Sequence, residues 1–505
     1  MTDQHERECG TVEPFMTSRA CFLELVDFAA GGTAAGLEHA ALEQELESRG
    51  RELLRQLFQD HLDLRADREQ RLAAVTDADG TGHRRVEANH NRALATVFGQ
   101  VTVRRQAYRA PGTTNLYPAD AALNLPVEKH SHGLRRLAAT EAARGSFEET
   151  VAAIDRGSGA RVGKRQVEAL TVRAAVDFND FYDQRRPSAA EPTQLLVLQV
   201  DGKGVVMRPE ALRPATAKAA DQATGKLAGR LSKGEKRYRK RIAEIGAVHD
   251  ATPAVRTSAD VLPATQAERA AAGDGPTATG KWLTASIVDD AATVVTSVFD
   301  EAVRRDPDHT RTWVALVDGN NHQIDRIHAE AHTRGATVHV LCDFVHVVEY
   351  LWKATWSFHR EGDPAAEVWV RDKARSVLAG KARTVAAAIR RTASTRRLPP
   401  AARKGADQAA AYLTNKAAYL DYRTALARGW PIATGVIEGA CRHLVADRLD
   451  ITGARWGLDS AEAVLRLRAL RSNGDFDDYW HYHLTRERNR LHATRYANKH
   501  IPQAA

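Results

Sequence analysis

The chain has 505 residues, which is enough for about three domains of ordinary size. Its 72 lysines and arginines exceed its 64 aspartates and glutamates by a net charge of +8, a modest excess that matters only where basic residues cluster. Four widely spread cysteines form no CxxC pair, which argues against a disulfide framework and a zinc ribbon. The start of the chain is charged, and no apolar run approaches the roughly 20 residues of a membrane span. We therefore expect a cytoplasmic protein.

The N-terminal part, residues 1–95, is predicted to be mainly helical. Between Arg19 and Gln70, apolar residues recur at helical spacing with charged residues between them, which predicts an amphipathic helix or a helical hairpin. Such a pattern favours a packing or oligomerisation element over direct contact with DNA.

The next part, residues 96–186, begins with a pattern typical of a β-hairpin. Apolar and basic residues alternate around a turn in 97–111, which predicts a hairpin that exposes Arg104, Arg105 and Arg109. Exposed arginines in this arrangement would be able to contact phosphate.

Three short helical patterns follow between residues 131 and 181. Ser146 and Glu149 form a capping-box start for the second, and the arrangement resembles a helix-turn-helix. Lys164 and Arg165 open the third helix, whose N-terminal end is therefore a candidate for the DNA major groove. Three-helix units also occur as plain packing modules, so both interpretations stay open.

An apolar run at Leu195–Gly204 predicts a buried strand with Asp201 at its exit. Two more strand patterns follow, and then a helix, a strand that ends on Asp318, a helix and a last strand. This order over residues 193–344 is that of an RNase H-like mixed sheet. We therefore predict an α/β catalytic core, preceded by a mainly α-helical DNA-binding region.

Residues 345–430 are predicted to be an all-α insertion with a strongly basic middle, and residues 431–505 to carry Glu438 and the C-terminal helices. Trp480, Tyr482 and His483 in the last helix are expected to face a core. Basic runs are often solvated surface, but next to a carboxylate site they also suit a phosphate backbone. The further candidate DNA contacts are Lys236, Arg237, Arg239, Lys240, Arg241, Arg390, Arg391, Arg396, Arg397, Arg455 and Trp456.

Three acidic residues are candidates for a metal site. Asp201 and Asp318 each follow an apolar strand pattern and precede a glycine, and Glu438 lies between two glycines. Aspartate before glycine is often only a hairpin turn, but the set favours carboxylates that converge on Mg²⁺ or Mn²⁺ ions for phosphodiester cleavage. Asp343 is a natural helix N-cap, and His346 lies one turn later and could point into the same site.

Several long motifs in this order resemble those of one family of enzymes. The segments LQVDGKGVVMRPEALR, TWVALVDGNNHQ, LCDFVHVVEYLWKA and GVIEGACRHLVADRLDITGARWG are similar to successive signatures of the ISKra-group insertion-sequence transposases, which are DDE enzymes. FGQVTVRRQAYRAP and LYPADAALNLP resemble the N-terminal region of the same family. The resemblance runs from about Val97 to the C-terminus.

The resemblance implies a function and a set of site residues. Asp201, Asp318 and Glu438 would be the metal-binding triad for two Mg²⁺ or Mn²⁺ ions, and Asp343 and His346 would support these ligands or position DNA. The implied reaction is cleavage at the ends of a mobile element and strand transfer into target DNA, without a nucleotide cofactor. The helical insertion before the glutamate also fits related groups.

The resemblance further implies the partners and leaves two alternatives. The partners would be double-stranded DNA, as terminal inverted repeats and target, and at least one more copy of the chain, with the protein associated with the nucleoid. A domesticated, non-catalytic DNA-binding protein would bind element ends without cutting them. A structure-selective RNase H-like nuclease would cut branched or RNA-containing duplexes without joining ends.

Overall fold

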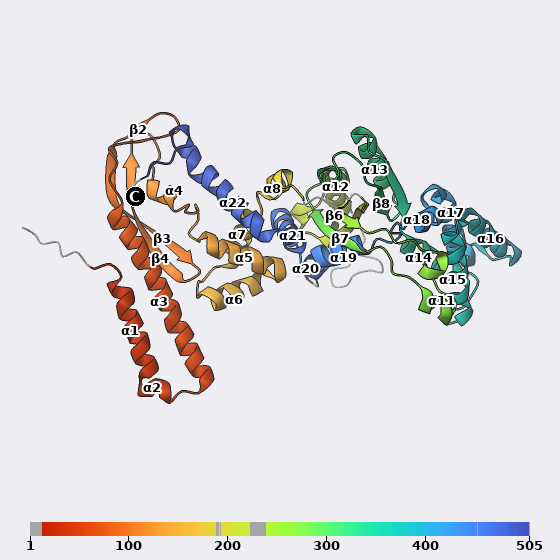
Figure 1. The fold of residues 1–505 in the computed structure, drawn as a ribbon, viewed down its shortest axis with the longest axis horizontal. Helices are drawn as coiled ribbons and strands as arrows, with labels where there is room; N and C mark the ends of the chain where they lie inside the picture. Colours follow the sequence, from red (N-terminus) through yellow and green to blue (C-terminus); the bar gives the residue numbers. More distant parts are fainter. Residues whose placement is uncertain (1–12, 188–190, 192, 223–238, 452, 504–505) are drawn as a thin grey trace, which may run out of the picture. The chain divides into compact units, whose positions relative to one another are not determined.

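The computed structural model describes residues 13–187, 191, 193–222, 239–451 and 453–503 (Figure 1). Contacts divide the chain into two compact units, one of residues 1–181 with 476–505 and one of residues 182–475. We call them the N-terminal unit and the sheet unit. The last helix thus belongs with the N-terminal part of the chain, which no feature of the sequence indicated.

The N-terminal unit begins with the predicted helical hairpin. Its helices are α1 (Met16–Ala30), the short α2 (Gly32–Ala35) and the long α3 (His39–Arg68). The Ser18 amide donates to Asp60 Oδ2 over 3.0 Å, and the Arg49 guanidinium lies 4.0 Å from the centre of the Phe28 ring. These two contacts show that α1 and α3 run antiparallel.

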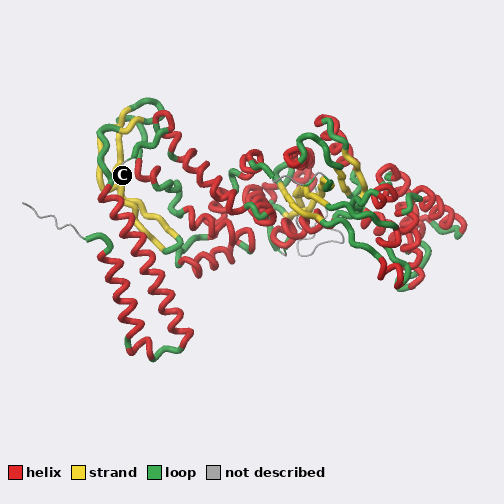
Figure 2. The backbone as a smooth tube through the Cα atoms, in the orientation of Figure 1, coloured by secondary structure: helices red, strands yellow, loops and turns green. Residues whose placement is uncertain are grey.

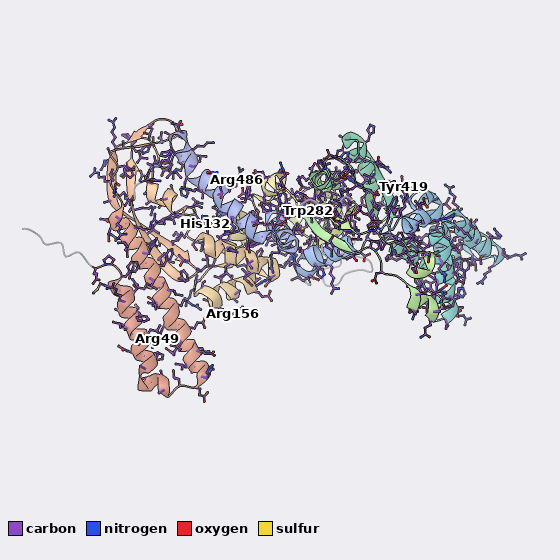
Figure 3. All side chains as sticks on the ribbon, viewed as in Figure 1. Arg49, His132, Arg156, Trp282, Tyr419 and Arg486 are labelled. Carbon is purple, nitrogen blue, oxygen red and sulfur yellow. The ribbon has the colours of Figure 1, made fainter. Side chains whose placement is uncertain are left out.

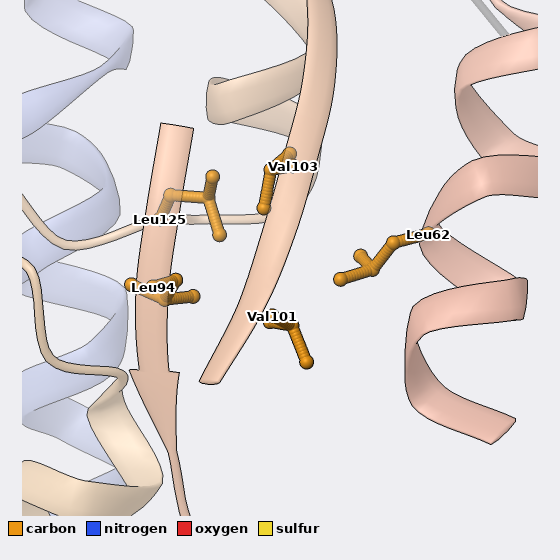
Figure 4. Close-up of a cluster of buried hydrophobic side chains, with 5 residues drawn as sticks. All are labelled: Leu62, Leu94, Val101, Val103 and Leu125. Atoms are coloured by element: carbon orange, nitrogen blue, oxygen red, sulfur yellow. The ribbon is translucent and has the colours of Figure 1, made fainter. Parts of the chain in front are cut away.

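A two-stranded sheet packs against α3. Its strands β3 (Arg85–Thr96) and β4 (Gly99–Arg109) form the predicted hairpin, and a smaller pair, β1 (Val75–Thr76) and β2 (Gly82–His83), lies nearby in the chain. Apolar side chains from α3, both long strands and the following segment form a core (Figure 4). Its buried members are Leu62, Leu94, Val101, Val103 and Leu125.

The expectation that this hairpin exposes its arginines holds for Arg109 alone, because Arg104 and Arg105 are partly buried. Arg104 pairs with two aspartates of α3, and Arg109 pairs with Glu87 of the neighbouring strand. Arg105 is largely buried, with its guanidinium 2.9 Å from Asp120 and 4.3 Å from the centre of the Tyr117 ring. All three arginines are thus paired with carboxylates of neighbouring segments.

Three helices form the bundle predicted between residues 131 and 181. They are α5 (His132–Arg144), α6 (Phe147–Ser158), which starts with the expected capping box, and α7 (Lys164–Ala174). The last long helix, α22 (Phe476–Leu491), joins them through Tyr479, whose hydroxyl donates to the Ala174 carbonyl over 2.7 Å. The short helices α4 (Pro118–Ala122) and α8 (Phe178–Gln184) flank the bundle in the sequence.

A buried charge cluster holds this bundle together. The fully buried Arg135 of α5 pairs with Glu128 and, over 2.6 Å, with Glu487 of α22. His483 accepts from Arg135 at Nε2 over 3.0 Å and meets Asp177 at Nδ1 over 2.7 Å. The expectation that His483 and Trp480 face a core is confirmed, since both are buried.

The sheet unit is built on a five-stranded mixed sheet (Figure 2). The spatial order is β7-β6-β5-β8-β9, with the first three strands antiparallel and the last two parallel to β5. These strands confirm the five predicted ones. They are β5 (Leu195–Val206), β6 (Lys240–Ala251), β7 (Ala278–Ser286), β8 (Trp313–Val317) and β9 (Val338–Cys342).

Helices cover both faces of this sheet. On one face, α12 (Ala291–Arg305) packs on β5 and β6, and α13 (Asn321–Arg334) packs beside it. Gly246 of β6 allows α12 this approach, because a Cβ there would lie 2.5 Å from Val298. The opposite face is covered by α19 (Gly435–Ala440), a π-helical segment (Cys441–Ala446), α20 (Asp447–Leu449) and α21 (Leu458–Asn473).

A helical region begins and ends at one edge of the sheet. Its helices are α14 (Phe344–Thr355), α15 (Pro364–Leu378), α16 (Ala382–Thr395), α17 (Pro400–Asn415) and α18 (Tyr422–Ala427). The Phe344 amide donates to the Ile432 carbonyl over 2.9 Å, so the two ends of the region meet. The remaining helices, α9 (Pro214–Asp221), α10 (Ser258–Val261) and α11 (Gln266–Ala271), lie in connections.

Among the described residues, no helix combines the length and the apolar character that crossing a lipid bilayer requires. The mixed α/β core with helical regions before and after it agrees with the coarse fold class expected from the sequence.

Candidate active site at the carboxyl edge of the parallel strands

Asp201 lies on β5, and Asp318 and Asp343 directly follow β8 and β9. Each pair between β5 and β8 joins residues 117 positions apart, and Asp318 also stands 117 positions after Asp201. Each pair between β8 and β9 joins residues 25 positions apart, which is also the separation of Asp318 and Asp343. Adjacent strands lie about 5 Å apart. Continued two residues past the last β5–β8 pair and one residue past the last β8–β9 pair, these registers bring the three aspartates to one level at the carboxyl edge of the parallel strands.

Asp201 does not stand at a strand exit, contrary to the expectation. The strand β5 continues to Val206, paired with β6, although its pairing with β8 ends at Gln199. Gly202 lets the two long strands stay paired, because a Cβ there would come within 2.7 Å of Ile242. Asp201 is half-buried, accepts a hydrogen bond from its neighbouring amide at Oδ1 over 2.7 Å, and receives one from the Cys441 thiol at Oδ2 over 3.2 Å.

Asp318 follows the end of β8 directly, as expected. Its Oδ1 accepts from the Asn320 amide over 2.7 Å in the turn that leads into α13. Gly319 has a positive φ of 98°, and a Cβ there would lie 3.0 Å from the Tyr412 hydroxyl, so a larger residue would not fit this turn. The half-buried Asp318 side chain is thus held at the edge without an ion-pair partner among the described residues.

Asp343 is fully buried and connects three elements. Its Oδ1 accepts from the Val345 amide over 3.0 Å, which confirms the predicted N-cap of α14. Its Oδ2 accepts from the Thr434 hydroxyl over 2.8 Å and lies 3.3 Å from Nδ1 of His346. Asp343 therefore fixes the residue before α19 to the end of β9, and it orients the partly exposed His346 ring at the same edge.

Glu438 lies on α19, which is anchored across the row of aspartates. The helix is tied to β5 at its start, because the Ile437 amide donates to Gln199 Oε1 over 2.9 Å. Just after its end, Cys441 contacts Asp201. Glu438 itself is exposed and has no ion-pair partner in the described part of the chain. The structure thus brings its helix to the same edge as Asp201 and Asp318, although 120 positions separate Glu438 from Asp318.

Protonation equilibria near the row reflect these neighbours. Burial, together with the charge of Asp201 and its hydrogen bond, raises the pKa of the Cys441 thiol far above its usual value, and Glu438 adds to this effect. Burial raises the pKa of Cys342 to about 11, with Asp318 and Asp343 contributing. The hydrogen bond to Asp343 raises the pKa of His346, and the charge of Asp318 acts in the same direction.

The residue types suit a hard divalent cation. Asp201, Asp318 and Glu438 offer carboxylate oxygens, which Mg²⁺ and Mn²⁺ prefer. Among the described residues, no three His, Cys, Asp or Glu side chains are gathered closely enough to hold an ion as they stand.

The residues proposed to contact DNA differ in their surroundings. In the N-terminal unit, Lys164 and Arg165 are both exposed at the start of α7, although Lys164 pairs with Glu148 of α6. Lys236 and Arg237 lie outside the described residues. Arg239 is half-buried, and Lys240 is exposed but pairs with Asp450 over 2.8 Å.

Two of these residues donate hydrogen bonds to backbone carbonyls within the sheet unit. Arg241 donates from Nε to the Ile287 carbonyl over 2.6 Å, and burial lowers its pKa. Trp456 is 5% exposed, and its indole N–H donates to the Leu449 carbonyl over 3.1 Å. Trp456 is therefore not available to DNA in this structure, Arg241 is half-buried, and Arg455 is exposed.

The four arginines of the helical region lie at the end of α16. All four are exposed. Arg390 donates to the Ala410 carbonyl over 3.4 Å, and Arg396 donates to the Phe358 carbonyl over 2.8 Å. Within the described residues, neither Arg391 nor Arg397 has an ion-pair partner. Four exposed cations therefore lie within eight positions at this place.

Four residues that position the candidate site were not found from the sequence. Gln199, Thr434 and Cys441 anchor α19, as described above. The buried Lys416 contacts Asn321 at the start of α13, next to Asp318 in the chain. Gln199 carried a usable signal, because an uncharged polar residue inside an apolar strand pattern needs a buried partner.

No protein-family model matches the chain, and a search of curated proteins finds no relative. The functional assignment therefore rests on the site and on the resemblance of its motifs.

Proposed function

We propose that the protein is a DNA transposase of a bacterial insertion sequence, with Asp201, Asp318 and Glu438 as its catalytic carboxylates. The observation that carries the proposal is the β5–β8 register, which aligns Asp201 with Asp318 when it is continued two residues past its last pair, together with the contacts that hold the Glu438 helix to Gln199 and Asp201. Phosphodiester cleavage with two divalent ions would need these carboxylates, from three separate parts of the chain, at one point.

The three carboxylates would hold two Mg²⁺ or Mn²⁺ ions, which would stabilise charge on the attacking and leaving oxygens. Asp343 would keep the Glu438 helix in place through Thr434. His346, held by Asp343 and partly exposed, would contact the bound DNA backbone close to the reacting phosphate. The reaction would be cleavage at the element end, followed by attack of the freed 3′-hydroxyl on target DNA.

The architecture supports an RNase H-like assignment for the sheet unit. The chain runs through three antiparallel strands, a helix, a parallel strand, a helix and a second parallel strand, which is the order expected for that fold. The helices α14–α18 fit an insertion, because their two ends are hydrogen-bonded at the sheet edge and the chain then returns to Glu438.

Two surfaces are proposed to bind double-stranded DNA. The start of α7 with Lys164 and Arg165 fits a helix that enters the major groove, and the end of α16 offers four exposed arginines for the phosphate backbone. The element ends would be bound by the N-terminal unit, and the reacting strand would be held at the sheet edge.

The test is strand cleavage and joining on a labelled duplex that carries the DNA flanking this gene, with Mg²⁺ or Mn²⁺. The intact protein should nick and join strands, and Asp201→Asn should lose both activities while it still binds the duplex. Binding without cutting by the intact protein would instead support the non-catalytic DNA-binding protein. Cutting of branched or RNA-containing duplexes without joining would support the nuclease, and cutting that survives in Asp201→Asn would remove the carboxylates from the mechanism.

A further inference from the structure

Lys203 is a cation beside the candidate site that the proposed mechanism does not use. It follows Asp201 by two residues on β5, and side chains two positions apart in a strand lie on the same face of the sheet. That face is covered by α19 and the π-helical segment, because Gln199 is hydrogen-bonded to α19 and Asp201 to Cys441. Lys203 therefore lies on the side of the sheet that carries Glu438.

The part of β5 that carries Lys203 extends past the ends of the parallel strands. The pairing of β5 with β8 ends at Gln199, whereas its pairing with β6 continues to Val206. Lys203 pairs with Ala243 of β6, and β8 no longer flanks it on the other side. At about 3.3 Å per residue, its Cα lies about 7 Å beyond that of Asp201. The half-buried lysine thus starts just beyond the carboxylates, where the sheet has narrowed to two strands.

The charge of Lys203 reaches the candidate site but is not neutralised there. Burial and the charge of Asp201 raise the pKa of the Cys441 thiol, and the charge of Lys203 opposes this rise. That thiol lies 3.2 Å from Asp201 Oδ2, so the ammonium acts on a group in direct contact with a candidate metal ligand. In the part of the chain that the structure describes, no carboxylate forms an ion pair with Lys203. The ammonium is therefore available to an anionic ligand.

A lysine at this position suits DNA better than it suits a metal ion. Its positive charge repels a divalent cation bound by Asp201, so it does not strengthen the proposed metal site. The DNA backbone, in contrast, carries one negative charge on each phosphate. An ammonium has three hydrogen-bond donors and is a common phosphate-binding group in proteins. Lys203 thus fits the substrate of the proposed reaction rather than its ions.

The spacing of Lys203 and Asp201 indicates which phosphate is involved. The reacting phosphate would lie against the ions held by Asp201 and Asp318. Successive nucleotides of one strand are about 3.4 Å apart along the axis of the duplex. The displacement of about 7 Å along β5 therefore corresponds to one or two nucleotides. We expect the lysine beside a neighbouring phosphate and not beside the reacting one.

We propose that Lys203 binds a backbone phosphate of the DNA strand that is cleaved, one or two nucleotides from the reacting bond. Its ammonium donates to a non-bridging oxygen of that phosphate and so fixes the position of the strand at the sheet edge. The proposal rests on the proposed function, because it takes DNA as the ligand of this edge. It adds a contact next to the carboxylates to the expected contacts at α7 and α16.

The first test is the salt dependence of duplex binding in Ca²⁺, a hard cation that carboxylates also bind. Each phosphate contact made by a cation steepens the plot of log K against log salt concentration by about 0.9 in B-DNA. Lys203→Gln should reduce the slope by about this amount, and Lys203→Arg should restore it. An unchanged slope in Lys203→Gln would overturn the proposal.

The matched control for this test is Lys281→Gln. Lys281 is exposed on β7, next to Trp282 (Figure 3), and β6 separates that strand from β5. The variant loses the same charge from the same sheet, and it should bind the duplex with the slope of the intact protein. Equal reductions of the slope in Lys203→Gln and Lys281→Gln would show an effect of net charge alone and would overturn the proposed contact.

The second test identifies the phosphate. Duplexes are compared in which one phosphate at a time is replaced by a neutral methylphosphonate. For the intact protein, the replacement one or two nucleotides from the reacting bond should weaken binding about tenfold. In Lys203→Gln the same replacement should have little further effect, because both changes remove one and the same contact. Equal losses in the two proteins at every position would overturn the proposal.

A third measurement separates DNA binding from support of the carboxylates. Lys203→Gln should bind Mn²⁺ at least as tightly as the intact protein, because a repelling charge is lost. Weaker Mn²⁺ binding would mean that the lysine holds the metal ligands in place, and it would overturn the proposal. Duplex binding that depends on Lys203 in a protein that cuts no DNA would refute the catalytic function alone. Cleavage by the intact protein, with duplex binding that does not depend on Lys203, would refute the lysine contact alone.

Discussion

Charged residues in two regions of the molecule have opposite surroundings. In the N-terminal unit, Arg135 is fully buried and meets Glu128, Glu487 and His483. At the sheet edge, Asp201, Asp318 and Glu438 are half-buried or exposed, and none of them has an ion-pair partner among the described residues.

The difference separates charges that hold the fold from charges that are available to a ligand. A buried charge that is fully matched has no capacity left for a further partner, and removing it leaves its neighbours uncompensated. Carboxylates that are held in place by the backbone, but not neutralised, keep oxygen lone pairs for a cation. We expect changes at Arg135 to affect stability and changes at the sheet edge to affect chemistry.

The largest expected effect is at the sheet edge. Asp318→Asn should lower strand cleavage about a thousandfold, because the charge is lost while Oδ1 can still accept from the Asn320 amide. The free energy of unfolding should change by less than about 0.5 kcal/mol. Asp325→Asn, on the exposed side of α13, is the control and should leave cleavage intact. If Asp318→Asn also lowers the free energy of unfolding enough to explain its loss of cleavage, Asp318 holds the fold and is not a charge kept available for a ligand.

The counterpart in the N-terminal unit is Arg135→Met. It should destabilise that unit by about 3–5 kcal/mol, because Glu128 and Glu487 are left buried without their cation. Arg136→Met removes an exposed arginine that pairs with Asp477 over 2.6 Å, and it should cost less than about 1 kcal/mol. Urea unfolding followed by circular dichroism measures both. Equal losses of stability in the two variants would show that burial does not determine how much each arginine contributes to stability.

A pH dependence should appear in the sheet unit through His249 of β6. This ring is buried, and its Nδ1 has no hydrogen-bond partner among the residues that the structure describes. Burial lowers its pKa to about 3, with Lys281 and Arg305 contributing. Below pH about 6.5 the unfolded chain binds a proton that the folded protein does not take up until pH about 3, so stability falls as the pH falls through this window.

The loss attributable to His249 between pH 7 and pH 5 should be about 2 kcal/mol. His249→Gln should show a correspondingly smaller difference between the two pH values in urea unfolding. An unchanged difference would mean that the folded protein protonates this ring readily.

The smallest effect concerns the link between Asp343 and the Glu438 helix. Thr434→Val keeps the shape of the side chain but loses the hydrogen bond to Asp343, which should cost about 1 kcal/mol of stability. Cleavage should fall about tenfold, because α19 is less firmly held at the edge. Thr434→Ser keeps a hydroxyl and should retain most of the activity. If the valine and serine variants cleave equally well, the link does not position Glu438.

The sequence predicted which segments form strands better than it predicted where those strands end. Apolar patterns gave all five strands, and the turn residues after β8 placed Asp318 correctly. The same reasoning ended β5 too early, because Gly202 reads as a turn signal, whereas here it lets β5 pass close to Ile242 of β6.

Long-range contacts were beyond sequence reasoning. Trp456 looks like a surface residue for DNA, but it is buried and its amide donates to the Val206 carbonyl, 250 positions earlier in the chain. The pairing of Arg135 with Glu487, 352 positions apart, places the last helix in the N-terminal unit. Such contacts depend on tertiary packing, which local periodicity does not encode.

The most direct test of the account is Mn²⁺ binding, measured by electron paramagnetic resonance on the intact protein and on the double variant Asp201→Asn with Asp318→Asn. The account predicts that the intact protein binds Mn²⁺ and that the double variant, still folded by circular dichroism, loses this binding. Equal binding by the two proteins would contradict the claim that the aligned carboxylates form a metal site.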